Sequence, residues 1–171
     1  MLICQHILLH SAFGFGSAGT MTLPPTWDLF DDAHLPHRIL LLARMLDRET
    51  ARHLQEDFAL TLAEWRVLAF VCSVGPSSAA DIGSAFEVDR AEVSRAVARL
   101  EARGLILRKT APDNRKKMIL QPTPPGRETF EKARLTRQKY FETILQDLDA
   151  GQVHILNEGL QRIARRVKST V

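Results

Sequence analysis

The side chains most able to do chemistry in this sequence are arginines and lysines, and they gather between Arg90 and Lys117. That stretch holds nine lysine and arginine residues against three acidic ones, a local net charge of +6, whereas the whole chain carries only +3. The rest of the chain therefore nets −3, so positive charge is concentrated where a polyanion such as DNA would be held. The candidate contacts there are long cationic or short polar side chains: Arg90, Ser94, Arg95, Arg99, Arg115, Lys116 and Lys117.

A helix that begins at residue 90 would position the first of these side chains. Asp89 is suited to cap it, because a carboxylate accepts the unpaired amide hydrogens of a first helical turn. Glu92 lies three residues on, where it completes a capping box. Three apolar residues at helical spacing predict the buried face, opposite the cationic one: Val93, Val97 and Leu100. Gly104 ends the helix.

Two short β-prone runs follow at once, at 105–109 and 117–121, around a turn that contains Pro112, Asp113 and Asn114. An arginine-rich helix alone is often only a solvated surface. A capped helix that runs straight into a hairpin with a cationic tip is much less common, and this combination favours DNA binding. Ser78, at the start of the preceding short helix, is added to the candidate DNA contacts.

Further helices are predicted on both sides of this segment. Residues 35–57 carry a long apolar stripe and are expected to be heavily buried. Residues 62–73 follow Thr61, a cap with Glu64 as its partner, and residues 78–86 are capped by Ser77 or Ser78. A helix from 124 to about 148 has proline in its first turn.

The last predicted helix, at about 150–168, carries a heptad-like apolar seam: Val153, Leu156, Leu160, Ile163 and Val167. Such a seam can pack within one chain or against a second copy. The chain has more apolar helical surface than a small DNA-binding core can cover, and two-fold DNA sites favour two-fold proteins. The sequence therefore favours a homodimer.

Composition sets the limits of these hypotheses. The chain is 45% hydrophobic and 25% charged, as expected of one ordinary domain, here residues 21–171. Residues 1–20 carry no charge and precede Met21, so we interpret them as a leader or a mis-set start. Two cysteines give neither a disulfide scaffold nor a zinc pattern. No enzyme motif, cofactor loop, metal site or membrane helix is predicted, and we expect a cytoplasmic protein.

Four segments of the sequence together resemble the MarR (multiple antibiotic resistance regulator) family of transcription factors: LTLAEWRVLAFV, GPSSAADIGSAF, DRAEVSRAVARLEARGLILR and APDNRKKMILQPTPPGRE. The resemblance implies a mainly α fold with a small β-wing. It assigns residues 60–123 to a winged helix-turn-helix DNA-binding lobe. It assigns residues 35–57 and 124–170 to dimerisation helices, in a homodimer that binds a pseudo-palindromic duplex.

The resemblance also implies roles for single residues. The Asp113-x-Arg115 pattern matches the wing tip of the family, where Arg115 would enter the minor groove while Asp113 holds its guanidinium. Ser94 and Arg95 would meet the major groove. Two departures stand out, because Glu87 replaces a frequent glycine and Glu92 replaces a small hydroxyl residue, where it could cap the helix or repel a phosphate.

Members of the family usually repress transcription until a small, often aromatic and anionic, effector binds beside the DNA-binding lobe. The candidate residues for such a site offer rings and cations: Trp27, His34, His37, Arg38, Arg44 and Trp65. Each has a simpler interpretation. Trp65 can belong to the core, Arg44 can pair with Asp47 or Glu49, and the two histidines can be solvated at a helix start.

Two rival functions come from other classes. An enzyme would need a constellation of catalytic residues, and the serines, histidines and aspartates here are scattered. A thiol-based oxidant sensor on the same fold would use Cys72, the only cysteine in the predicted folded region. Its apolar surroundings, AFVCSV, are more typical of a small buried hydrophobic residue than of a reactive thiol.

Overall fold

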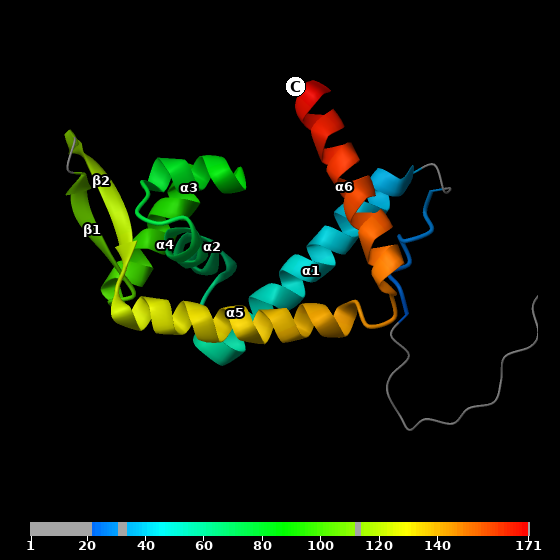
Figure 1. The fold of residues 1–171 in the computed structure, drawn as a ribbon, viewed down its shortest axis with the longest axis horizontal. Helices are drawn as coiled ribbons and strands as arrows, with labels where there is room; N and C mark the ends of the chain where they lie inside the picture. The colour runs from blue at the N-terminus through cyan, green and yellow to red at the C-terminus, as the bar shows by residue number, and fades with distance from the viewer. Residues whose placement is uncertain (1–21, 31–33, 112–113, 171) are drawn as a thin grey trace, which may run out of the picture. The chain divides into compact units, whose positions relative to one another are not determined.

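A computed structural model describes residues 22–30, 34–111 and 114–170, without the side chains of 114–116. Their helices and strands follow in the order α1 (Leu35–Phe58), α2 (Leu62–Ser73), α3 (Ala79–Phe86), α4 (Arg90–Ala102), β1 (Ile106–Ala111), β2 (Asn114–Pro122), α5 (Pro124–Ile144) and α6 (Ala150–Thr170). The predicted fold class, mainly α with a small β-wing, is confirmed (Figure 1). The chain divides into two compact units, Met1–Ala43 and Arg44–Val171.

The core of the second unit lies where α2, α3 and α4 pack beside the hairpin, and α5 leaves from the base of β2 (Figure 1). The predicted inner face of α4 is confirmed, since Val93, Val97 and Leu100 are at most 2% exposed. They pack in one cluster with apolar residues of every neighbouring element, including Leu68, Ile82, Ile106, Leu120 and Phe130. Burying each such side chain contributes about 1.5–3 kcal/mol.

The wing is a two-stranded antiparallel hairpin whose strands are longer than predicted. Ile106 pairs with Pro122 and Thr110 with Met118, and the register becomes irregular at Ala111. β2 is also fixed to the segment before α3, because Ser77 and Leu120 exchange backbone hydrogen bonds of 3.3 and 2.8 Å. The hairpin is therefore held against the helices at its base.

Side-chain caps set where the helices of the second unit begin. Thr61 and Glu64 form the predicted capping box of α2, and Ser78, rather than Ser77, caps α3 with Asp81 as its partner. Asp89 caps α4 by accepting from the Ala91 and Glu92 amides. Within the described chain the Glu92 carboxylate does not return a bond to Asp89, so the predicted capping box is only half formed. A single carboxylate already satisfies two amides of the first turn.

The turn between α3 and α4 has the geometry that glycine usually supplies, although Glu87 occupies it. Glu87 is the C-cap of α3 with φ 52°, and its amide donates to the Gly83 carbonyl. A left-handed conformation costs a non-glycine residue about 1–2 kcal/mol. The replacement of glycine by glutamate therefore leaves the local turn intact.

One predicted dimerisation helix, α1, is less buried than the sequence suggested, and α6 is exposed along its apolar seam. In α1 only Thr50 and Leu54 are buried, so the expectation that 35–57 is heavily buried is wrong for the single chain. No residue of α6 is buried, and Leu156 and Leu160 of its seam are 49% and 40% exposed. Apolar periodicity shows that a helix has an apolar face, but it does not show what covers that face.

Candidate nucleic-acid interface

The outer face of α4 presents three of the predicted DNA contacts to solvent. Arg90, Ser94 and Arg95 are exposed, on the side opposite the buried Val93 and Val97. Among the residues that the structure describes, neither Arg90 nor Arg95 has an ion-pair partner, although carboxylates lie nearby in the sequence. Two cations and a hydroxyl are thus held on a rigid helix and remain available to a polyanion.

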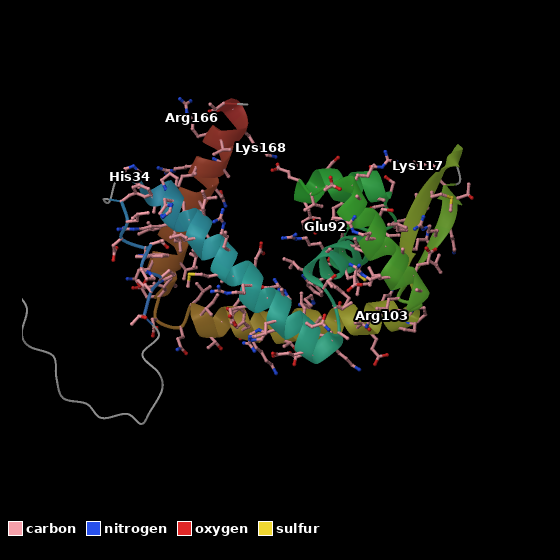
Figure 2. The ribbon with its side chains drawn as sticks, turned by 180° about the vertical axis from the view of Figure 1, so that it is seen from behind. His34, Glu92, Arg103, Lys117, Arg166 and Lys168 are labelled. Atoms are coloured by element: carbon pink, nitrogen blue, oxygen red, sulfur yellow. The ribbon has the colours of Figure 1, made fainter. Side chains whose placement is uncertain are left out.

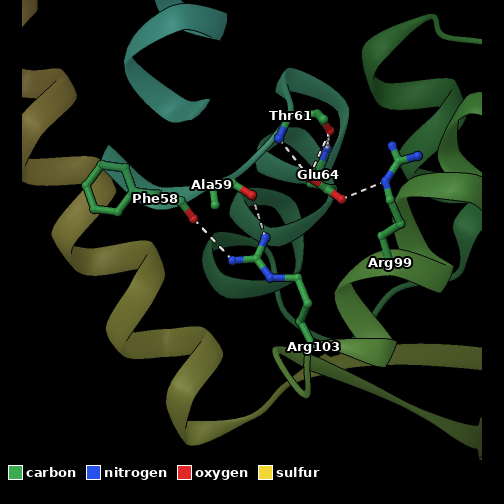
Figure 3. A network of polar contacts seen from close by, with 6 residues as sticks. All are labelled: Phe58, Ala59, Thr61, Glu64, Arg99 and Arg103. Atoms are coloured by element: carbon green, nitrogen blue, oxygen red, sulfur yellow. Dashed lines mark hydrogen bonds and ion pairs between the residues drawn. The ribbon is translucent and has the colours of Figure 1, made fainter. Parts of the chain in front are cut away.

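The other two arginines of the α4 segment are engaged within the protein. Arg99 pairs with the carboxylate of Glu64 on α2, with 2.7 Å between Nε and Oε1. Arg103, the C-cap of α4, donates to the carbonyl oxygens of Phe58 and Ala59 at 3.1 and 2.7 Å (Figure 3). These contacts give Arg99 a structural role, and its predicted DNA contact stays a prediction.

Glu64 is a buried acid, only 3% exposed, at the centre of this group of contacts. Burial by itself would raise the pKa of this carboxyl. Hydrogen bonds from Thr61 and Arg99 outweigh that effect and hold its pKa below the ordinary value. Glu64 is therefore kept ionised, as a buried partner for Arg99.

The wing brings a further cation, Lys117, beside α3. Lys117, exposed on β2, lies 3.8 Å from the Asp81 carboxylate at the start of α3 (Figure 2). Ser78, also predicted as a DNA contact, is buried and uses its hydroxyl to cap α3. The predicted minor-groove pair of Asp113 and Arg115 lies outside the described part of the chain, which lacks Asp113 and the Arg115 side chain. The side chain of Lys116 lies outside it as well.

Four predicted effector residues belong to the first unit, and each makes local contacts within it: Trp27, His34, His37 and Arg38. Arg38 lies 3.4 Å from both the Trp27 carbonyl and the Asp28 carboxylate. His37 lies 3.2 Å from the Thr26 carbonyl, and Phe30 contacts the rings of both His34 and His37 at 4.8 Å. Segment 22–30 is thereby attached to the start of α1.

The remaining two predicted effector residues belong to the second unit. Arg44 is exposed, and its suggested partners are taken, since Asp47 pairs with Arg66 and Glu49 with Arg52. Trp65 is half-buried and stacks on Phe130, with 5.6 Å between ring centroids. Trp65 also lines a cavity of about 450 Å³, together with residues of α5 and its C-cap Leu145: Arg134, Arg137, Gln138, Phe141 and Glu142.

Arg137 is the residue in this cavity that the sequence interpretation missed. Its guanidinium carbon lies 5.3 Å from the Trp65 ring centroid and 5.0 Å from that of Phe141. Its Nη1 is buried and has no hydrogen-bond partner among the described residues, and burial lowers the pKa of the side chain. An arginine four residues before Phe141 on an apolar helix face was the available signal. The cavity is therefore lined by two aromatic rings and by an arginine whose guanidinium has one buried nitrogen without a hydrogen-bond partner in the described chain.

Cys72 has the environment of a core residue. It is half-buried beside the hydrophobic cluster, and burial raises the pKa of its thiol to about 11. Almost none of it is the nucleophilic thiolate near neutral pH. In the segments that the structure describes, no group of His, Cys, Asp and Glu side chains is placed to hold a metal ion, and no helix is long and apolar enough to span a membrane.

Comparisons with known proteins agree with this geometry. The MarR family profile matches residues 60–117. The helix-turn-helix transcriptional regulator YwoH of Bacillus subtilis is 30% identical over 114 residues, which are 67% of this chain and 82% of that protein. The transcriptional repressor NicR of Pseudomonas putida is 31% identical over 114 residues, 66% of this chain and 72% of that protein.

A solved structure shares the fold. A MarR-family regulator from Listeria monocytogenes, crystallised with a 26mer DNA, superposes with a TM-score of 0.72. The superposition covers 82% of this chain and 92% of that one, at 21% sequence identity. The arrangement of α2, α3, α4 and the hairpin is thus the winged helix-turn-helix predicted from the sequence.

Proposed function

This chain belongs to the MarR family of DNA-binding transcriptional regulators, and we propose that it is a homodimeric repressor of one pseudo-palindromic operator. The observation that carries the proposal is the outer face of α4, where Arg90, Ser94 and Arg95 are exposed and the two cations lack partners in the described chain. The relative NicR is named a transcriptional repressor, which supports repression rather than activation. Sequencing the DNA selected by the purified protein from a random pool tests it. Failure to enrich any sequence would contradict it.

In the proposed complex, α4 reads the major groove and the wing reads the minor groove. Ser94 and Arg95 meet base edges, and Arg90 lies near the phosphates at the start of the helix. Arg115, held by Asp113, enters the minor groove, while Lys116 and Lys117 contact phosphates. These roles of the wing are supported by its sequence motif alone. The DNA complex of the Listeria regulator supports a role of this fold in binding a duplex.

The proposed dimer pairs the helical regions 35–57 and 124–170 of two chains. Its support is the exposed seam of α6, whose Leu156, Leu160 and Val167 are 49%, 40% and 60% exposed. Apolar patches of this kind usually mark interfaces. Two recognition helices in successive major grooves require half-sites about 10 bp apart. Light scattering that gives a monomeric mass at micromolar concentration would rule the dimer out.

We propose further that a small aromatic carboxylate or phenol releases the operator by binding in the cavity beside Trp65. The guanidinium of Arg137 supplies positive charge for a carboxylate, and its Nη1 has no hydrogen-bond partner in the described chain, while Trp65 and Phe141 line the cavity with aromatic rings. Of the residues predicted from sequence, Trp65 lines this cavity, and Trp27, His34, His37, Arg38 and Arg44 stay predictions. A coupling of about 1–3 kcal/mol would weaken operator binding about 5–150-fold.

A titration of operator complexes with benzoates, hydroxycinnamates, indole acids and their thioesters tests the effector. We expect Arg137→Met to lose the response while operator binding persists. Arg134→Met is the matched control, because Arg134 lines the same cavity but is exposed and paired with Glu131 at 2.9 Å. If no compound releases DNA or shifts the melting of the free protein, the cavity holds no effector of these classes.

A thiol switch at Cys72 is the second candidate, and the raised pKa of its thiol weighs against it. Peroxide treatment should leave operator binding intact. Loss of binding that a reductant restores would favour the switch.

A further inference from the structure

The C-terminal half of α4 is fixed to the junction between α1 and α2, residues 58–61, by two arginines (Figure 3). Arg103 donates hydrogen bonds from its two terminal nitrogens to two successive carbonyl oxygens, from Nη2 to Phe58 and from Nη1 to Ala59. Phe58 is the last residue of α1, and Ala59 has φ 51°, so both carbonyls lie where the hydrogen bonding of the helix ends. A cation with two donors in a planar fork suits such a helix C-terminus.

The second attachment is the ion pair between Arg99 and Glu64. The Glu64 carboxylate is almost wholly buried, and it accepts from the Thr61 amide at 2.7 Å and the Thr61 hydroxyl at 3.0 Å as well as from Arg99. Thr61 is the cap of α2, so Arg99 is connected to the residue at which α2 begins. Arg99 and Arg103 lie one helical turn apart and contact residues that are also close in sequence.

The two halves of α4 therefore have different partners. Its N-terminal half carries Arg90 and Arg95, whose charges are unpaired in the described chain. Its C-terminal half ends in Arg99, whose Nε is bound to Glu64, and Arg103, whose two terminal nitrogens are bound to backbone carbonyls. A phosphate contact through the Nε of Arg99, or through either terminal nitrogen of Arg103, would break one of these bonds. Glu64 in particular would then be left as a buried charge without its cationic partner.

We propose that Arg99 and Arg103 are positioning residues for DNA recognition, which fix α4 on the junction 58–61 and thereby set where Arg90 and Arg95 meet the duplex. The inference rests on the proposed function, because it assumes that α4 reads DNA. Arg90 and Arg103 are separated by about 20 Å along the helix, at about 1.5 Å per residue. A tilt of about 10° at the Arg103 end would move Arg90 by about 3 Å, comparable to the length of a hydrogen bond.

Two conservative variants test the inference by fluorescence anisotropy. Arg103→Lys keeps the charge but loses the planar fork, and Glu64→Gln removes the partner of Arg99 without touching any DNA-facing residue. We expect each to weaken binding to the selected operator about 5-fold or more, while binding to unrelated duplex changes less than about 2-fold. The slope of log affinity against log salt should be unchanged, because no phosphate contact is lost.

The alternative is that both arginines contact phosphates directly. In that case Arg103→Lys should bind the operator nearly as wild type does, and Glu64→Gln should bind it as tightly or more tightly, since Arg99 is released toward DNA. Arg99→Gln and Arg103→Gln would then each lower the salt slope by about one unit on operator and unrelated DNA alike. These results would overturn the positioning role.

Arg52→Lys is the matched control, because Arg52 is an exposed arginine of α1 with ion pairs of 2.9 Å to both Glu49 and Glu56. It should leave operator affinity and salt slope unchanged. Thermal unfolding confirms that each variant is folded at the assay temperature. If the wild-type protein selects no DNA sequence, the proposed function itself is wrong. If the wild type selects an operator but Arg103→Lys and Glu64→Gln bind it with unchanged affinity, only the positioning role is wrong.

Discussion

The lobe formed by residues 60–123 and the C-terminal helix α6 use the same kind of apolar residue in opposite ways. In the lobe, Leu68, Ile82 and Leu100 are completely buried. In α6, Leu156 and Leu160 are at least 40% exposed, and no residue of the helix is buried. The lobe thus completes its core within one chain, whereas the seam of α6 needs a second surface. The stability of the lobe should be independent of protein concentration, and the contribution of α6 should not be.

The largest expected effect comes from a matched pair of leucines, Leu100 on α4 and Leu160 on α6. Leu100→Ala should lower the free energy of unfolding by about 2–5 kcal/mol, because it leaves a cavity in a closed core. Leu160→Ala should act only through the dimer, so its effect should grow with protein concentration. Urea unfolding at two protein concentrations measures both. A Leu160→Ala effect that is equal at both would show that the seam packs within one chain.

Two glycines extend the comparison. A Cβ at Gly126, in the first turn of α5, would overlap the Leu105 carbonyl oxygen, whereas a Cβ at Gly159 on α6 would meet nothing within 4 Å. Gly126→Ala should therefore destabilise the protein by about 1–3 kcal/mol through overpacking. Gly159→Ala should stabilise α6 by up to about 1 kcal/mol, because alanine favours a helix. Thermal unfolding tests both, and a Gly159→Ala variant that weakens the dimer would place the partner chain against Gly159.

A third prediction separates specific from nonspecific cations in the wing. Arg115→Ala should weaken operator binding by about 1–3 kcal/mol, most at sites with A·T-rich flanks, as expected for a lost minor-groove contact. Lys116→Ala and Lys117→Ala should have smaller effects at all sequences and lower the salt slope by about one unit per lost phosphate contact. Equal behaviour of the three variants in salt titrations would mean that Arg115 is another phosphate contact.

The sequence predicted those features that depend on neighbours along the chain. The Asp89 cap, the inner face at Val93, Val97 and Leu100, and the hairpin after Gly104 follow from local spacing, and all three are confirmed. The contact between Arg99 and Glu64 joins residues 35 positions apart, so no local pattern could indicate it. An arginine at that spacing has the same sequence signature whether it contacts DNA or a buried acid.

The candidate effector cavity was predicted in part for a similar reason. Trp65 was proposed as an aromatic surface, and it lines the cavity. Arg137 was missed, because in the sequence it resembles any solvated arginine of a long amphipathic helix. Only the folded structure shows that its guanidinium lies over the rings of Trp65 and Phe141. The exposure of α1 was also not predicted, since periodicity does not distinguish a face buried within a chain from one buried between chains.

The smallest predicted effect concerns Glu64, the buried acid of the lobe, whose carboxyl pKa is held below its ordinary value of 4.5. A group whose pKa is lowered by folding contributes stability that is complete above its unfolded pKa and is lost as the pH falls through its folded pKa. The difference in unfolding free energy between wild type and Glu64→Gln should therefore be constant from pH 7 to about 5 and shrink below pH 4.5. Urea unfolding across this range measures it.

Glu128 on α5 is the control for this prediction. Its pKa is also lowered, by Lys132 at 2.7 Å, but both side chains are 67% exposed, so solvent screens the pair. Glu128→Gln should give a smaller pH-dependent difference from wild type, reduced further by salt, whereas the effect of Glu64→Gln should persist in salt because Glu64 is buried. A Glu64→Gln difference that stays constant down to pH 3, or one that salt abolishes as it does for Glu128→Gln, would show that Arg99 is held no more firmly than a surface arginine.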